Sequence, residues 1–243
     1  VSVFGLNRLP HTILPGLAAF IVLWILLPVP PASVSRKQNF FGSVRESIGD
    51  VWKPILAIWG LAVMRSFLEQ ATLTFMPVLY ASEGHSLVSV GGIISLFTIG
   101  GAVSSLACGP LADRIGFRPI YYISFGLSSP CFLFFIYSSG WPVYPFSFLF
   151  GFLNLATLFP AVALAQQIAP KGRALVSSII MGLTLGTAGI LMPVAGKFAD
   201  LFGMRPVLSG MALVPLAALL LIHRLPESSS VRSTRSRGLR EPA

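Results

Sequence analysis

The sequence predicts an all-α membrane protein with seven transmembrane helices, six of which form a bundle of two inverted three-helix repeats. Three observations predict this fold. Of the 243 residues, 54% are hydrophobic and only 10% are charged, whereas about 25% of the residues in a soluble domain are charged. The hydrophobic residues gather in seven long runs, and one glycine-rich pattern occurs twice. The runs are continuously apolar and lack the two-residue alternation of barrel strands, which favours helices.

Each run is a candidate span, because a helix needs about 20 residues to cross the hydrocarbon core. A polar stretch separates the first run from the other six, and a basic tail with few apolar residues follows the last. The tail composition predicts disorder. The predicted spans are Ile13–Val29, Val51–Tyr80, Val88–Leu111, Pro119–Tyr137, Pro142–Ile168, Leu175–Phe198 and Val207–His223. The predicted domains are a first span in residues 1–30, a loop in 31–50, a six-helix bundle in 51–225 and a tail in 226–243. The chain opens without Met, and we expect an N-terminal truncation.

The distribution of Lys and Arg predicts the orientation. By the positive-inside rule, the connections richer in these residues lie in the cytoplasm. The poorer set of connections holds Arg8, Lys197 and Arg205. The richer set, which predicts a cytoplasmic loop and C-terminus in a plasma (inner) membrane, holds Arg36, Lys37, Arg45, Lys53, Arg114, Arg118, Lys171, Arg173, Arg224, Arg232, Arg235, Arg237 and Arg240.

The repeated pattern follows the third and the sixth spans. Its first copy is Gly109-x-x-Ala112-Asp113-x-x-Gly116-x-Arg118-Pro119, and its second copy is Gly196-x-x-Ala199-Asp200-x-x-Gly203-x-Arg205-Pro206. We interpret residues 109–119 as a short charged turn between two spans. An odd number of spans separates the copies, so they are expected on opposite membrane faces, as in the inverted repeats of transporters. Chance similarity of two glycine-rich turns is the alternative.

Two charges lie inside the second span. Arg65 and Glu69 are four residues apart and therefore share one helical face. Thr72 and Met76 extend this face, and we expect Met64, Phe67, Leu68, Ala71 and Phe75 to form a lipid-compatible opposite side. Charges at bilayer depth each cost about 2.5–3.5 kcal/mol, so they pair or line water. One hypothesis is that Glu69 exchanges protons and that substrate binding at Arg65 switches its protonation. A static salt bridge is the alternative.

Other polar residues within spans give weaker indications. Asn154 lies in the middle of the fifth span, where substrate contact and interhelical hydrogen bonding are equally supported. Gly182, Gly186 and Gly189 in the sixth span favour close helix packing. The three histidines lack ligand spacing, and no nucleophile with a His/Asp context or phosphate-binding Gly-x4-Gly-Lys loop occurs. We therefore expect no metal, no cofactor and no enzyme activity. The basic residues cluster at span ends, so nucleic acid is not an expected partner.

The run Gly109-Pro-Leu-Ala-Asp-Arg-Ile-Gly-Phe-Arg resembles the cytoplasmic signature of the major facilitator superfamily. The resemblance implies the C-terminal half of a major-facilitator fold, with residues 13–223 as its sixth to twelfth helices. It also implies a conformational clamp at Gly109, Asp113, Arg114, Gly116 and Arg118. Phe117 stands where the family often has a basic residue, which weakens the expected clamp. The clamp's partner would lie in an absent N-terminal half, which we expect activity to need.

The run Arg65-Ser-Phe-Leu-Glu69-Gln70, together with Pro170–Ser178 and Gly182–Gly186, is similar to the fosmidomycin-resistance type of drug exporter. This resemblance implies proton-coupled efflux of a small drug-like or phosphonate-like compound, with protons and substrate meeting at Arg65, Glu69, Gln70 and Asn154. The alternatives are proton-coupled uptake of an organic anion or sugar, and a non-transporting product of a split gene.

Overall fold

The computed structural model describes residues 13–26, 49 and 51–223. The predicted loop, apart from residue 49, and the predicted tail lie outside the described residues. Helix α1 (Ile13–Leu26) falls in a separate unit, residues 1–42, and is described by itself. The other helices are α3 (Trp52–Ser82), α4 (Leu87–Ile115), α5 (Phe117–Tyr137), α6 (Val143–Leu155), α7 (Leu158–Ile168), α8 (Arg173–Ser178), α9 (Thr184–Phe202), α10 (Met204–Met211) and α11 (Val214–Ile222).

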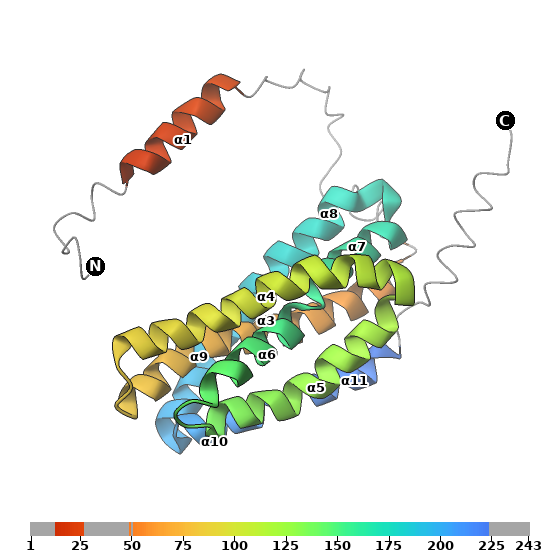
Figure 1. The fold of residues 1–243 in the computed structure, drawn as a ribbon. Helices are drawn as coiled ribbons and strands as arrows, with labels where there is room; N and C mark the ends of the chain where they lie inside the picture. Colours follow the sequence, from red (N-terminus) through yellow and green to blue (C-terminus); the bar gives the residue numbers. More distant parts are fainter. Residues whose placement is uncertain (1–12, 27–48, 50, 224–243) are drawn as a thin grey trace, which may run out of the picture. The chain divides into compact units, whose positions relative to one another are not determined.

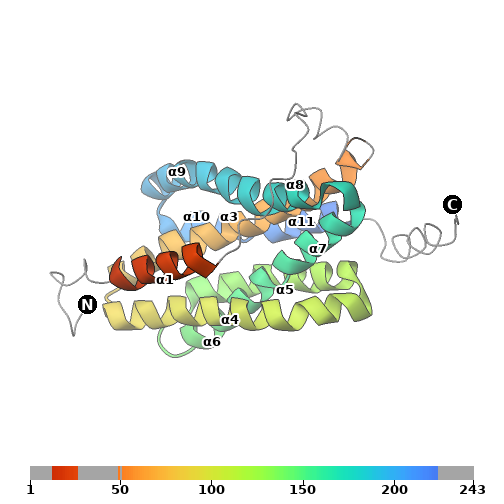
Figure 2. The same cartoon turned by 90° about the horizontal axis from the view of Figure 1, so that it is seen from above.

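The second unit is a bundle of six antiparallel rods. Helices α3, α4 and α5 each form one rod, whereas α6 with α7, α8 with α9, and α10 with α11 form the other three (Figures 1 and 2). A π-helical turn, η3 (Ile179–Leu183), joins α8 to α9. The six predicted spans from Val51 to His223 are confirmed as helical segments, and their ends differ from the prediction by a few residues.

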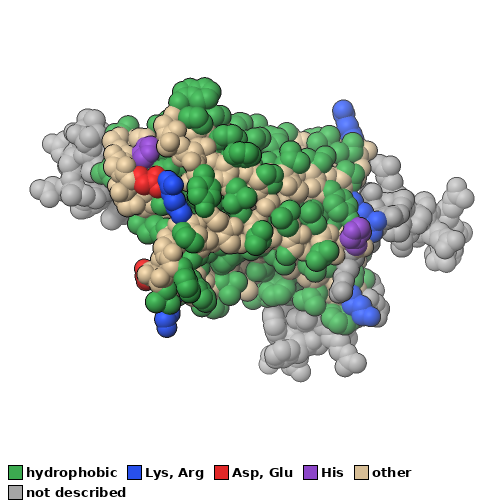
Figure 3. Space-filling view, turned by 90° about the horizontal axis from the view of Figure 1, so that it is seen from below, with side chains coloured by type: hydrophobic (Ala, Val, Ile, Leu, Met, Phe, Trp, Pro, Cys, Tyr) green, Lys and Arg blue, Asp and Glu red, His purple; other side chains and the backbone are tan. Residues whose placement is uncertain are grey.

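The bundle has the surface of a membrane protein. In the described part of the chain, five helical segments are long and apolar enough to cross a membrane. The rod α3 is long enough, at 31 residues, but Arg65, Glu69 and Gln70 make its middle less apolar. Hydrophobic side chains cover the middle of the face in Figure 3, and the coloured charges gather toward its two ends. Ile190, Leu106 and Leu220, for example, are about three-quarters exposed or more, which indicates contact with lipid rather than water.

Two hydrophobic cores fill the bundle, one toward each end. Core I contains Ile58, Leu61, Phe117, Tyr121, Leu164 and Ile180, among others. Core II contains Met76, Tyr80, Phe97, Phe132, Phe135 and Phe150, among others. Leu68 and Ala71 are also fully buried in core II, so their expected place on a lipid-compatible side is wrong. The reason is that α3 is surrounded by other helices on most sides, including α7, α9 and α11.

The joint between α4 and α5 is a single residue. The predicted charged turn at 109–119 is wrong in extent, because α4 continues through Pro110 to Ile115 and α5 begins at Phe117. Gly116 has φ 88° and ψ 169°, and its N–H donates to Ala112 O at 3.0 Å. Gly203 has φ 90° and ψ 154°, and its N–H donates to Ala199 O at 2.9 Å. The two copies therefore share one local structure, and they lie at opposite ends of the bundle (Figure 1), which supports an inverted repeat.

Helices α4 and α6 touch through their backbones. A Cβ atom at Gly151 would overlap the Phe97 carbonyl, and one at Gly100 would overlap the Phe148 carbonyl. Ser147 Oγ donates to Ile93 O at 2.5 Å across the same contact. Small residues allow close approach of this kind between membrane helices. The expected packing role of Gly182, Gly186 and Gly189 is wrong in the described bundle, because a Cβ there would meet no atom within 4 Å.

We predict that Gly151→Ala destabilises the bundle by about 1–3 kcal/mol, the usual cost of overpacking, because the added methyl group forces α4 and α6 apart. The matched control is Gly126→Ala in α5, where a Cβ meets nothing within 4 Å. Cys108 and Cys131 are buried thiols, so a thiol-reactive dye reports thermal unfolding of the detergent-solubilised protein. Equal melting temperatures for the two variants would contradict the close contact.

Candidate functional site

Arg65 and Glu69 form an ion pair in the interior of the bundle. Arg65 Nη1 donates to Glu69 Oε2 at 2.6 Å, and the two side chains are 4% and 21% exposed. The second terminal nitrogen, Nη2, has a long contact of 3.4 Å to Ser66 Oγ. A guanidinium can bind a carboxylate through two parallel hydrogen bonds, and this pair uses one. The site therefore keeps donor capacity for a second acceptor.

The ion pair lies in a polar layer between the two cores. Along α3, core I ends at Ala62 and core II begins at Leu68, with Arg65 between them. Each of the other rods except α10–α11 likewise carries a buried polar residue where it passes from one core to the other. This mid-bundle polar layer consists of Arg65, Ser66, Ser104, Ser128, Ser129, Asn154, Thr157 and Thr184.

Three rods are irregular where they pass through this layer. Helix α6 ends at Leu155 and α7 begins at Leu158, because the ring of Pro160 would clash with the Ala156 carbonyl in a continuous helix. Pro215 interrupts α10–α11 at Ala212 and Leu213 in the same way. The π-helical turn η3 lies beside Thr184. Discontinuous helices near the bilayer midplane mark substrate sites in transporters. The sequence interpretation missed these breaks, although Pro160 and Pro215 were visible signals.

Most polar groups of the layer have partners. Ser128 Oγ donates to Phe125 O at 3.1 Å, and Ser129 Oγ donates to the Ala212 carbonyl at the break in α10–α11. Tyr121 OH donates to Thr157 O at 3.5 Å. Asn154 is the exception, because its Nδ2 atom is buried without a partner among the described residues.

The predicted substrate residues are brought together only in part. Arg65, Glu69 and Asn154 all belong to the layer or pair with it. Gln70 is half-buried and turned about 100° from Glu69 around the axis of α3, so it does not share the face of the ion pair. In the described residues, no three His, Cys, Asp or Glu side chains group together as metal ligands would.

The predicted clamp residues lie at the junction of α4 and α5. Gly109 and Arg114 belong to the last two turns of α4, and Arg114 is exposed. Arg118, in the first turn of α5, is half-buried. The side chain of Asp113 lies outside the described part of the structure. The structure therefore confirms the position of the motif at a helix junction but does not test a clamp.

The second copy of the motif makes a different set of contacts. Arg205 Nη2 lies 2.7 Å from Glu83 Oε1, and its Nε donates to the same oxygen at 2.9 Å. The guanidinium also lies over the Tyr137 ring, 5.8 Å from its centre. Arg205 thus ties the start of α10 to the ends of α3 and α5. This ion pair is partly exposed and lies at the bundle end, away from the polar layer.

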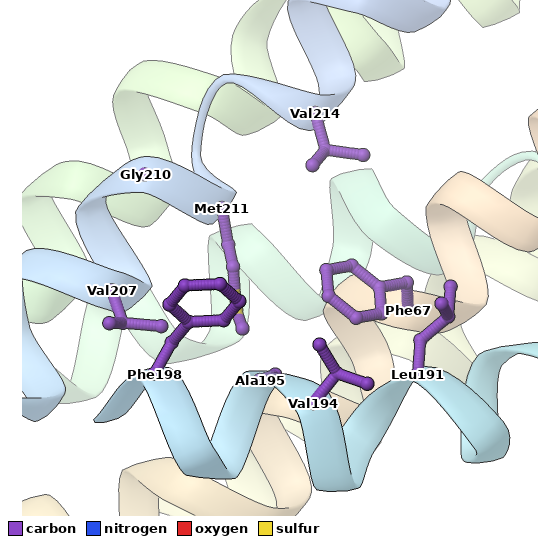
Figure 4. A pocket seen from close by; sticks show the side chains of 9 residues that line it. All are labelled: Phe67, Leu191, Val194, Ala195, Phe198, Val207, Gly210, Met211 and Val214. Atoms are coloured by element: carbon purple, nitrogen blue, oxygen red, sulfur yellow. The ribbon is translucent and has the colours of Figure 1, made fainter. Parts of the chain in front are cut away.

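An apolar crevice opens between α3, α9, α10 and α11 (Figure 4). It has a volume of about 340 Å³, and Phe67, Phe198 and Met211 project into it. No charged or hydrogen-bonding side chain lines it; its walls are Phe67, Leu191, Val194, Ala195, Phe198, Val207, Gly210, Met211 and Val214. An apolar crevice gives no orientation to a polar ligand, so the polar layer is the better candidate site.

An apolar-surfaced bundle of inverted repeats, with a buried ion pair beside interrupted helices, is an architecture found in membrane-embedded secondary transporters. The comparison with protein families agrees. The family model described as Major Facilitator Superfamily matches residues 11–181 and, in a second match, residues 58–242. The chain belongs to the Major Facilitator Superfamily.

Three curated relatives are similar to the chain. The 4-hydroxybenzoate transporter PcaK of Pseudomonas aeruginosa is 33% identical over 198 residues, 77% of this chain and 42% of the relative. The protein of the same name from Pseudomonas putida is 30% identical over 199 residues, with the same coverage. The uncharacterized MFS-type transporter YfnC of Bacillus subtilis is 26% identical over 159 residues, 65% of this chain and 39% of the relative. The chain thus spans about two fifths of their length. No solved structure matches the chain.

We predict that the two glycines of the first motif copy differ in their tolerance of substitution. Gly116→Ala should cost about 1–3 kcal/mol, because its φ of 88° with extended ψ is open almost only to glycine. Gly109→Ala is the control, since its Cβ would meet nothing within 4 Å and α4 is continuous there. The dye-based melting temperature measures both effects. A loss of stability in Gly109→Ala as large as that in Gly116→Ala would refute the prediction.

Proposed function

We propose that the protein transports a small organic carboxylate together with a proton, and that an aromatic acid of the 4-hydroxybenzoate type is the favoured substrate. The observation that carries this proposal is the buried guanidinium of Arg65, which uses one nitrogen for Glu69. Arginine suits carboxylate recognition because its planar fork matches the two oxygens. Two relatives that are 30% or more identical are named as 4-hydroxybenzoate transporters.

Efflux of a drug-like compound is the second candidate. It rests on the similarity of the Arg65–Gln70 run to fosmidomycin-resistance exporters, which the comparisons do not confirm. No relative found is named for fosmidomycin or drug export, and a phosphonate would also bind a guanidinium. We therefore rank organic-anion transport first. The side of the membrane on which a labelled carboxylate accumulates under a proton gradient separates the two candidates.

In the proposed mechanism, the substrate carboxylate competes with Glu69 for Arg65. When the substrate binds the guanidinium, Glu69 loses its partner, although its side chain is only 21% exposed to solvent. A carboxylate that loses its cation in a site largely closed to solvent favours the protonated form. Proton uptake at Glu69 and anion binding at Arg65 therefore accompany each other. Release of the anion lets the ion pair form again and expels the proton.

We predict that Glu69→Gln in the complete transporter abolishes proton-driven accumulation of labelled 4-hydroxybenzoate but retains exchange of internal for external substrate. The amide mimics a protonated Glu69, so anion binding persists while coupling is lost. Glu83→Gln is the matched control, because Glu83 also pairs with an arginine but lies at the bundle end. Accumulation that survives in Glu69→Gln would contradict the proposed coupling. Failure of the parent protein to move any organic carboxylate would contradict the proposed substrate class.

We further propose a topology and a partner for the transport cycle. The end of the bundle that carries Arg114, Arg118 and Arg173 would face the cytoplasm of a plasma membrane, and so would the C-terminus. An N-terminal half with a complementary surface would complete the substrate site and would meet the clamp at Asp113. The relatives, more than twice as long as the matched region, support the need for such a half.

We predict that Asp113→Ala in the complete transporter slows 4-hydroxybenzoate transport several-fold while membrane abundance stays unchanged. The expected reason is the loss of a contact that stabilises one state of the cycle, not the loss of the binding site. Initial transport rates, normalised to protein detected in the membrane by immunoblot, measure the effect. An unchanged rate would remove the clamp from the mechanism.

A further inference from the structure

We propose that Asn154 selects substrates that carry a hydroxyl group, or another hydrogen-bond acceptor, on the side of the ring opposite the carboxylate. This inference rests on the proposed function, in which Arg65 binds the carboxylate. It adds the residue that distinguishes a hydroxylated aromatic acid from the unsubstituted one.

The first step is the unpartnered amide. Asn154 is 4% exposed, and its Nδ2 atom has no partner among the described residues. The neighbouring hydroxyls of Ser104, Ser128 and Ser129 each donate to a backbone carbonyl. Buried polar groups in native proteins are paired in most cases, so a buried donor without a partner calls for an explanation. We take the explanation to be that a bound ligand supplies the hydrogen-bond acceptor for Asn154.

The second step is the position of Asn154 relative to Arg65. Asn154 lies near the end of α6, immediately before the break at Ala156 and Thr157. The carbonyl of Thr157, in the same break, accepts the hydrogen bond of Tyr121 from α5. Core II ends at Leu153 on this rod and core I begins at Ala161, so Asn154 lies between the same two cores as Arg65 does on α3. A substrate in this layer would find both a cation and a neutral donor there.

The third step is the chemistry of the two groups. A guanidinium is charged and forked, which suits a carboxylate, whereas an amide N–H suits a neutral oxygen such as a hydroxyl. A site built to hydrogen-bond a substrate hydroxyl discriminates strongly against the analogue without it, because its own donor then stays unpaired. Asn154 would accordingly affect the choice between substrates more than transport itself.

Trp59 supplies an internal comparison. Its Nε1 atom is also buried without a described partner, but Trp59 packs against core I rather than the polar layer. It precedes Arg65 by six residues, about 9 Å along the axis of α3. An unpartnered donor outside the layer has no expected role in substrate choice. Trp59→Phe removes this donor while keeping an aromatic ring.

The test measures transport of labelled 4-hydroxybenzoate and labelled benzoate by the complete transporter, in its parent form and as Asn154→Leu. We expect the parent protein to prefer 4-hydroxybenzoate over benzoate by about tenfold or more. Asn154→Leu should lose most of that preference while still transporting benzoate. Trp59→Phe should keep the preference. If Asn154→Leu does not reach the membrane, Asn154→Ala is measured in its place.

Two outcomes overturn the inference: a parent protein without the preference, or an Asn154 variant that keeps it. Both leave the proposed function intact, because benzoate transport itself reports Arg65. Absence of transport of both acids by the parent protein would instead overturn the proposed function and the inference with it.

Discussion

A buried guanidinium sets the main constraint on this bundle. Arg65 lies between two apolar cores, where an unpaired charge would cost several kcal/mol, and Glu69 one turn later supplies its partner. A charged pair is not compatible with close apolar packing across the middle of α3. All the other rods except α10–α11 have small hydroxyl or amide side chains at the same level, and the two cores end there. The mid-bundle polar layer is therefore a consequence of one charge and the groups needed around it.

The same layer is where three of the rods are interrupted. Pro160 and Pro215 remove backbone hydrogen bonds beside it, and Ser129 donates to the Ala212 carbonyl at the break in α10–α11. In lipid, freed backbone groups persist only where side chains or neighbouring helices satisfy them. The interruptions of three rods thus lie at the level of the polar site. In the proposed cycle, these interruptions are where the rods would bend when the ion pair changes.

The fold was largely predictable from the sequence, because apolar runs and the positions of Lys and Arg depend on the solvent more than on neighbours. The ion pair was predictable from its four-residue spacing. The faces of α3 were not, since Leu68 and Ala71 are apolar whether they meet lipid or another helix. Gly151 and Gly182 both lie in apolar runs of the sequence. Of the two, only Gly151 packs against the backbone of a neighbouring helix in the described structure. The unpartnered state of Asn154 depends on how α6 packs against α3, α4 and α5, and no local pattern encodes it.

Charge balance in the layer favours coupling of the proton and the anion in the same direction. In the proposed cycle, the empty site would hold the Arg65–Glu69 ion pair, with no net charge. The loaded site would hold Arg65, a substrate carboxylate and a proton on Glu69, again with no net charge. Binding of the anion alone leaves one negative charge in an apolar interior, and protonation of Glu69 alone leaves one positive charge. Desolvation penalises both of these charged states. The site would therefore switch from one side of the membrane to the other most readily when it holds neither anion nor proton, or when it holds both. An antiporter of neutral drugs would not gain this balance, because its substrate brings no charge to replace that of Glu69. The geometry of a single arginine paired with a single carboxylate therefore suits symport of a monovalent organic acid.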